Sequence, residues 1–244
     1  MMVGIFIIVS CHVLSQERLS NAQDKDAQIL ISRDVAVKEA LEYSGFEKMK
    51  GFSAKGNLDT SELVEINNDN TPFLHDKING RKLWKVVMKD IYLHFEENCD
   101  TYDTIPRIFE IYINAENGQL CKIEMKYSDN NYSLHSQPPS EIAEQTLKNQ
   151  KENYHGFVGT KTNISFYEAL RGGGVALSAK KINAILVEHS YFRSENKFRP
   201  AWVITYSGVP PSEMEKVEVN GRYHLRHVVD AESGELILVT VNIP

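Results

Sequence analysis

The sequence predicts an α+β protein made of two tandem repeats, each a helix packed on an antiparallel β-sheet. Three observations carry this prediction: a repeated turn segment, a tryptophan-containing strand before each copy of it, and a helical segment at the start of each half. The predicted organisation is a signal and tether over 1–28, a first repeat over 29–127, a linker over 128–139 and a second repeat over 140–244.

The repeated segment is interpreted as a turn between two strands. Asn114–Met125 reads NAENGQLCKIEM and Asp230–Val241 reads DAESGELILVTV, with Ala, Glu, Gly and Leu identical. The Asn or Asp can accept hydrogen bonds from the backbone that follows it, and the glycine can take the positive φ that a type I turn with a following bulge requires. Apolar alternation on both sides, RIFEIYI and CKIEMKY in the first copy, predicts a hairpin with one buried face.

A strand with a tryptophan precedes each turn. LWKVVM contains Trp84, 30 residues before the first turn segment, and AWVITY contains Trp202, 28 residues before the second. By strand alternation, Trp84 shares a face with Val86 and Met88, and Trp202 with Ile204 and Tyr206. Packing against the helix of its repeat is the favoured role of each tryptophan. The alternative is an aromatic platform on an open sheet face that binds a peptide or a protein.

Each repeat is expected to begin with a helix. In ISRDVAVKEALEYSGF, Ser32 suits an N-cap, apolar residues follow helical spacing and Gly45 is a natural stop. In PPSEIAEQTLKNQKENYHGF, Ser140 is the expected cap, and Gly156 comes after the expected end. The middle sections, 51–80 and 164–192, are expected to be strand or irregular chain. Within the second of them, RGGGVALSAKK lacks the spacing of a phosphate-binding loop and is predicted to be a flexible loop.

The N-terminus predicts export. MMVGIFIIVSC is an apolar run too short to span a bilayer as a helix, and its length suits the apolar region of a secretory signal, although no Lys or Arg precedes it. IVSC, ending at Cys11, resembles a bacterial lipobox, which implies lipidation of Cys11 and attachment in the periplasm or cell envelope. An ordinary secretory signal and a buried N-terminal strand are the alternatives.

The two remaining cysteines have two interpretations. Cys99 and Cys121 could form a disulfide in an exported protein. Alternatively, Cys121 is a small core residue, because alternation in CKIEMKY places it on the same face as Ile, Met and Tyr. The repeat alignment places Ile237 opposite Cys121, which favours the core interpretation.

No chemistry is predicted from the remaining motifs. A net charge of -6 and the lack of a basic run exclude a typical nucleic-acid-binding protein. His224 and His227 are three apart in a predicted strand and point to opposite faces, so no metal site is expected there. The turn carboxylates Asp230, Glu232 and Glu235 do not match a calcium loop. No catalytic residue, metal or cofactor is predicted, and the acidic pairs Glu96–Glu97 and Glu213/Glu215 are interpreted as solvated charge.

Helix, tryptophan strand and a hairpin carrying (V/I)(D/N)AxxGxL together resemble the PepSY domain, in two copies over about 29–127 and 140–241. The resemblance implies small units in which a helix packs on an antiparallel sheet, in exported or membrane-attached bacterial proteins, with a protein-binding or peptidase-inhibiting role. The two-copy arrangement is also similar in shape to the secreted β-lactamase inhibitor protein. Each unit here is longer than a minimal PepSY domain, and no HExxH zinc-peptidase motif is present.

The leading functional hypothesis is an exported, lipid-anchored, non-enzymatic protein that binds a protein or peptide, as an inhibitor or regulator of a peptidase. The alternative is a protein that binds a small molecule or envelope component in a cleft between helix and sheet. An enzyme is a third class, because a fold alone does not exclude one. No nucleic acid is expected as a partner, and the membrane is expected to be reached only through the lipid anchor.

Overall fold

The structure is a computed structural model, and it describes residues 30–66, 78, 80–93, 106–127, 154–173, 179, 181–192, 197–209 and 223–242. The described residues from Ile31 onward belong to one compact unit. The predicted signal and tether, Cys11, the predicted linker 128–139 and most of the helix expected from Ser140 lie outside the described residues.

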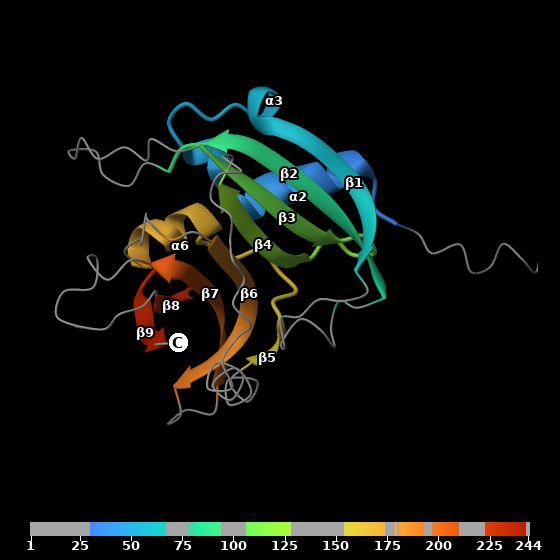
Figure 1. Cartoon of the computed structure of the whole chain (residues 1–244). Coiled ribbons are helices and arrows are strands. Elements are labelled where there is room, and N and C mark those ends of the chain that lie inside the picture. Colours follow the sequence, from blue (N-terminus) through green and yellow to red (C-terminus); the bar gives the residue numbers. More distant parts are fainter. Residues whose placement is uncertain are drawn as a thin grey trace, which may run out of the picture. The chain divides into compact units, whose positions relative to one another are not determined.

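The structure combines helices with an antiparallel sheet, which confirms the α+β part of the prediction (Figure 1). The helical elements in the described part of the chain are α2 (Arg33–Ser44), η1 (Phe46–Lys48), α3 (Ala54–Asn57) and α6 (Phe166–Gly173). The strands of the first half are β1 (Leu58–Ile66), β2 (Arg81–Ile91), β3 (Arg107–Asn114) and β4 (Leu120–Tyr127). Those of the second half are β5 (Tyr154–Phe157), β6 (Lys181–Phe192), β7 (Lys197–Val209), β8 (Tyr223–Asp230) and β9 (Leu236–Asn242).

All described strands belong to one antiparallel sheet in the order β1-β2-β3-β4-β6-β7-β8-β9, with β5 pairing β6 beside this path. The two halves meet where β4 pairs β6, through Ile123↔Ala184, Glu124↔Asn183 and Met125↔Ile182. Strands from both sides of the predicted linker are therefore hydrogen-bonded neighbours, and they share one sheet rather than forming two separate ones.

Helix α2 forms as the sequence predicts. The Ser32 side chain accepts a hydrogen bond from the Val35 backbone N–H, and Gly45, at φ 68°, donates its N–H to the Leu41 carbonyl. This left-handed residue ends the helix at a position that glycine adopts without strain. The buried side of α2, with Ala36 and Ala40 fully buried, lies against β2, β3 and β4.

Helix α6 was not predicted, and its last three residues correct the expectation of a flexible loop from Arg171. Ser165 begins it with a capping box: its backbone N–H and hydroxyl donate to Glu168 Oε2 at 2.9 and 2.7 Å, and its hydroxyl accepts from the Glu168 N–H at 3.4 Å. Phe166, Ala169 and Leu170 are fully buried and face the sheet, where α6 contacts β7 and β8. Residues 154–157, where the helix from Ser140 was expected to end, form strand β5.

Corresponding residues of the two halves make the same backbone and indole hydrogen bonds. Trp84 Nε1 donates to the Ile31 carbonyl at 3.1 Å, and Trp202 Nε1 donates to the Ile164 carbonyl at 2.8 Å. The Ile31 N–H in turn donates to Ala115, in the first turn, at 2.7 Å; the Ile164 N–H donates to Ala231, in the second turn, at 2.9 Å. Each tryptophan strand, helix start and turn are thus tied together by the same hydrogen bonds.

The core lies between the sheet and helices α2 and α6, and it is continuous across both halves. Aromatic rings connect the halves at its centre: Phe46 and Phe109 are 4.9 Å apart between ring centroids, Phe109 and Phe166 are 6.0 Å apart, and Phe166 and Trp202 are 5.9 Å apart. These residues come from η1, β3, α6 and β7, so neither half has a core of its own. In the described part of the chain, no helix is long and apolar enough to cross a membrane.

Candidate functional site

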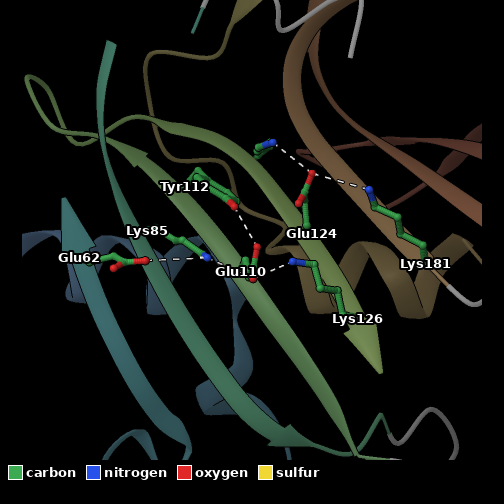
Figure 2. A network of polar contacts seen from close by, with 8 residues as sticks. Glu62, Lys85, Glu110, Tyr112, Glu124, Lys126 and Lys181 are labelled. Carbon is green, nitrogen blue, oxygen red and sulfur yellow. Dashed lines mark hydrogen bonds and ion pairs between the residues drawn. The ribbon is translucent and has the colours of Figure 1, made fainter. Parts of the chain in front are cut away.

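Polar side chains gather on the face of the sheet opposite α2 and α6, which we call the far face. Strand alternation assigns residues to it: Val86 and Ile111 lie in the helix-side core, so their neighbours Lys85, Glu110 and Tyr112 point to the far face. Figure 2 shows these side chains on neighbouring strands of the first half and of β6. Among the described residues, the charged side chains of the far face form the largest group that is connected by ion pairs and hydrogen bonds.

Glu110 is the centre of the first group on this face (Figure 2). Its Oε1 atom is 2.8 Å from Lys126 Nζ and 3.3 Å from Lys85 Nζ, and its Oε2 atom accepts a hydrogen bond from the Tyr112 hydroxyl at 2.9 Å. Burial alone would raise the pKa of the Glu110 carboxyl, but the bonds from Lys126 and Tyr112 and the charge of Lys85 hold this pKa below its ordinary value. Glu110 is therefore a fixed negative charge. Lys85 also lies 3.9 Å from Glu62 on the edge strand β1.

Glu124 is the centre of a second group, next to the first. Lys122 Nζ is 3.1 Å from its carboxylate, and Lys181 Nζ, on β6, is 3.9 Å from the same oxygen. Lys122 Nζ also lies over the Tyr112 ring at 4.6 Å from the centroid, which links the two groups. Lys181 comes from the second half of the chain, so this group forms only because β4 and β6 are adjacent.

A row of polar residues continues from Glu124 to the other edge of the sheet. Successive strands pair these residues directly, as Glu124↔Asn183, Asn183↔Thr205, Thr205↔Arg226 and Arg226↔Thr240. Directly paired residues have Cβ atoms about 5 Å apart, so neighbouring side chains in the row can reach one ligand group together. The arrangement can recognise a polar surface or a charged group, and it contains no nucleophile–base pair that would carry out a reaction.

Apolar side chains occupy the remainder of the far face. One cluster contains Leu83, Tyr112 and Cys121, and a second contains Val187, Val203 and Val228. The face is therefore mixed, with charged residues beside buried apolar ones. These apolar side chains are buried within the chain, with Phe157 of β5 packed against both clusters, so they are not exposed to a partner. The accessible side chains of the face include Lys126 and Lys181, which are 47% and 34% exposed.

Cys121 is buried with a free thiol, which confirms that it is a core residue. Its expected face was wrong. Ile113 pairs Leu120 but Tyr112 pairs Lys122, so Cys121 is an extra residue in a β-bulge and packs on the far face, opposite the core that contains Ile123. Burial raises the pKa of its thiol to about 12, so Cys121 is no nucleophile at neutral pH. Cys99 lies outside the described residues.

The acidic turn is structural. Asp230 Oδ1 accepts hydrogen bonds from the backbone N–H groups of Glu232 at 2.8 Å and Ser233 at 3.0 Å, and Asn114 Oδ1 accepts from Glu116 at 2.8 Å in the first turn. Gly118 and Gly234 have φ values of 75° and 78°, as the turn interpretation requires. The carboxylate that a cation would need is thus engaged by the backbone, and no group of three or more metal-ligating residues occurs among the described side chains.

The histidines form no metal site in the described part of the chain. His227 is buried against Tyr206, with 4.9 Å between ring centroids, and burial lowers its pKa to about 4. His189 is also buried, and its pKa is lowered to about 4 by burial and by the charge of Arg226. Both are therefore neutral at physiological pH. The side chain of His224 and the acidic pairs Glu96–Glu97 and Glu213/Glu215 lie outside the described residues.

Both tryptophans pack in the core on the helix side. Trp202 is fully buried, and Trp84 is half-buried against the same cluster. The packing interpretation is confirmed, and neither ring forms an exposed platform on the far face.

A cavity of about 280 Å³ lies where the end of α2 meets the segment before α6. Its lining includes Glu42, Lys48, Lys161 and Trp202. Lys48 is paired with Glu168 at 2.7 Å, and Lys161 is paired with Glu39 and Glu42, so both lysines of the lining already have carboxylate partners. Its volume is slightly below the range of about 300–1,000 Å³ found for small-molecule sites.

Comparisons with families of proteins, with curated proteins and with solved structures find no match to this chain.

Proposed function

We propose that this chain is an exported, lipid-anchored, non-enzymatic protein that binds a protein or peptide through the far face of its sheet. The far face carries the proposal, because its preformed charge groups around Glu110 and Glu124 include Lys126 and Lys181, whose side chains are accessible, on a rigid sheet. Such a surface binds without rearranging, which reduces the entropy lost on association. Blocking a peptidase by steric contact is the role that the PepSY resemblance suggests for this surface.

We also infer that the two halves are repeats of one unit. The identical hydrogen bonds of Trp84 and Trp202, and of Ile31 and Ile164, support this inference. They align ISRDVA, which begins at Ile31, with ISFYEA, which begins at Ile164, so α6 is the counterpart of α2. The repeat then reads helix, four strands and the same turn in each half.

The alternative, a small-molecule binding protein, has weaker support. Its expected site between helix and sheet corresponds to the cavity beside Trp202, which is small and lined by paired charges. The far face offers charged and polar groups over a larger part of the sheet.

Binding is tested with two double variants that each remove two exposed lysine charges. Lys126→Met with Lys181→Met removes charges from the far face, and Lys38→Met with Lys48→Met removes them from the helix side; the lysine side chains are 47%, 34%, 72% and 58% exposed, in that order. A partner is first captured by cross-linking in envelope extract, and its affinity for each purified protein is then measured. We expect the far-face pair to weaken binding by about tenfold or more, as for interfacial charge pairs. The helix-side pair should leave the affinity unchanged. Equal affinities of both variants would contradict binding through the far face.

Lipid anchoring has a separate test. Cys11→Ala should move the protein from the membrane fraction to the soluble fraction, because it removes the thiol that would carry the lipid, and one or two acyl chains dominate membrane affinity. Fractionation followed by immunoblotting measures the change, with Cys99→Ala as the control. Membrane association that is unchanged in Cys11→Ala would contradict the anchor.

A further inference from the structure

Arg226, in the middle of β8, is a buried cation without a counter-ion. Only 8% of the residue is exposed, its Nε atom is buried without a hydrogen-bond partner, and no ion pair joins it to another described residue. Desolvating a guanidinium costs several kcal/mol unless hydrogen bonds and an opposite charge compensate. Other charged residues on this face of the sheet, among them Glu110 and Glu124, have ion-pair partners. The free-energy cost of burying Arg226 without one points to a ligand that provides the missing negative charge.

The neighbours of Arg226 in the polar row have unused hydrogen-bonding atoms as well. Thr240, paired with Arg226 across β9, has a buried hydroxyl without a partner, and Asn183, two strands away, has a buried amide oxygen without a partner. Thr205 lies between Asn183 and Arg226 in the same row. In a native protein, buried polar atoms without partners are few, and each needs an explanation. The Thr240 hydroxyl can donate a hydrogen bond to an anion, whereas the Asn183 amide oxygen is an acceptor and cannot.

The carboxylates closest in this row are already engaged. Glu124 is paired with Lys122 and Lys181, and Asp230, on the same strand as Arg226, accepts the two backbone hydrogen bonds of its turn. Neither is free to neutralise Arg226. Among the described residues, no carboxylate therefore neutralises Arg226.

We propose that Arg226, with the hydroxyl groups of Thr240 and Thr205, receives a carboxylate group presented by the partner protein or peptide. This rests on the proposed function and specifies the chemistry of the partner: an Asp or Glu side chain, or a C-terminal carboxylate, that reaches the far face over β7–β9. Arg–carboxylate pairs are commonly bidentate, which adds orientation to the charge.

Charge balance selects a carboxylate rather than a phosphate. Arg226 supplies one positive charge, and His189, whose pKa is lowered, is neutral near pH 7 and adds none. Lys181, the nearest lysine on β6, is shared with Glu124. A phosphate group carries about −1.5 to −2 at pH 7 and would leave an uncompensated negative charge in this row.

The test uses acetate as the probe, with chloride replacing it at constant ionic strength. Stability is measured by urea unfolding of the wild type, of Arg226→Met and of Arg81→Met, which removes an exposed charge on β2. For a dissociation constant of about 10 mM, 100 mM acetate should raise the folding equilibrium constant of the wild type about tenfold. The same acetate concentration should raise the folding equilibrium constant of Arg81→Met by the same factor as that of the wild type. Arg226→Met should not respond, and without acetate it should be about tenfold or more better folded than the wild type, because the unpaired buried charge is gone.

A second measurement does not depend on the variant folding. In the wild type labelled with ¹⁵N-arginine, the Nε–H resonance of Arg226 should move on acetate titration while those of exposed arginines stay. An unmoved Arg226 resonance, a response of Arg226→Met equal to that of the wild type, or tighter binding of inorganic phosphate than of acetate would each overturn the carboxylate site. Acetate binding at Arg226 in a protein that captures no partner would leave this site standing and count against the proposed function instead.

Discussion

Trp202→Ala should lower the free energy of unfolding by about 3–5 kcal/mol, the cost of replacing a large buried aromatic side chain by alanine. Trp202 is fully buried, packs 5.9 Å from Phe166 between ring centroids, and donates its indole N–H to the Ile164 carbonyl at 2.8 Å. The substitution therefore opens a cavity and also removes one of the two side-chain hydrogen bonds to the Ile164 carbonyl, the other being that of the Thr162 hydroxyl. Trp202→Phe retains part of the packing and should cost less.

The same variant tests whether the two halves unfold together. The chain has two tryptophans, so in Trp202→Ala the fluorescence reports only Trp84, which lies in the first half. Because the core is continuous through Phe46, Phe109 and Phe166, we expect the Trp84 transition to shift to lower urea by as much as the far-UV circular dichroism transition. A Trp84 transition that stays at its wild-type midpoint would contradict the shared core. Trp84→Ala, at a half-buried position, is the matched control and should lose less stability.

Stability should fall steeply between pH 7 and pH 5, because two buried histidines resist protonation. The pKa of His189 and that of His227 are both lowered to about 4 by burial, with a further contribution from the charge of Arg226 for His189. In the unfolded chain a histidine has a pKa of about 6.5, so the unfolded state binds more protons in this range and gains stability as pH falls. Each histidine should account for a loss of about 2 kcal/mol between pH 7 and pH 5.

Urea unfolding at several pH values, on the wild type and on His227→Leu, measures this loss. Leucine cannot be protonated, and it keeps an apolar contact with Tyr206. The variant should lose about half as much stability as the wild type over the same pH range. Glu110 and Glu168, whose pKa values are lowered, add their own losses mainly below about pH 4.5, outside the range used here. A pH dependence that is identical in the two proteins would contradict the role of His227.

Local signals in the sequence predicted the elements whose conformation is decided locally. The cap at Ser32, the stop at Gly45 and the turns around Gly118 and Gly234 each depend on a few adjacent residues, and all are present in the structure. The faces of Trp84 and Trp202 followed from strand alternation, and both rings pack on the helix side.

Most of the missed features depend on contacts between distant residues. Helix α6 is an exception, because Ser165 and Glu168 have the S-x-x-E spacing of a capping box, which is a local signal for the start of a helix. The bulge at Cys121 changes the face of one residue without any local mark in the sequence. Pairing of β4 with β6 is a long-range event, and it alone brings Lys181 to Glu124.

The far face was partly visible in the sequence. Alternation in CKIEMKY places Lys122, Glu124 and Lys126 on one strand face, but their partners Glu110 and Lys181 come from other strands, which the local sequence does not bring together. Arg226 lies inside the segment HLRH. The two histidines of this segment raise the question of a metal site, but nothing in the segment indicates that the arginine is buried. Its burial without a counter-ion is decided by neighbouring strands β7 and β9, which the local sequence does not specify.

The central claim is that a partner binds the far face. Labelling of lysines in the free and the partner-bound protein tests this claim most directly. Free protein and cross-linked complex are acetylated briefly, and the modified lysines are quantified by mass spectrometry. We predict that the partner protects Lys126 and Lys181 on the far face, while Lys38 and Lys48 on the helix side react at the same rate in both samples. Protection of Lys38 and Lys48 with unchanged labelling of Lys126 and Lys181 would contradict the claim.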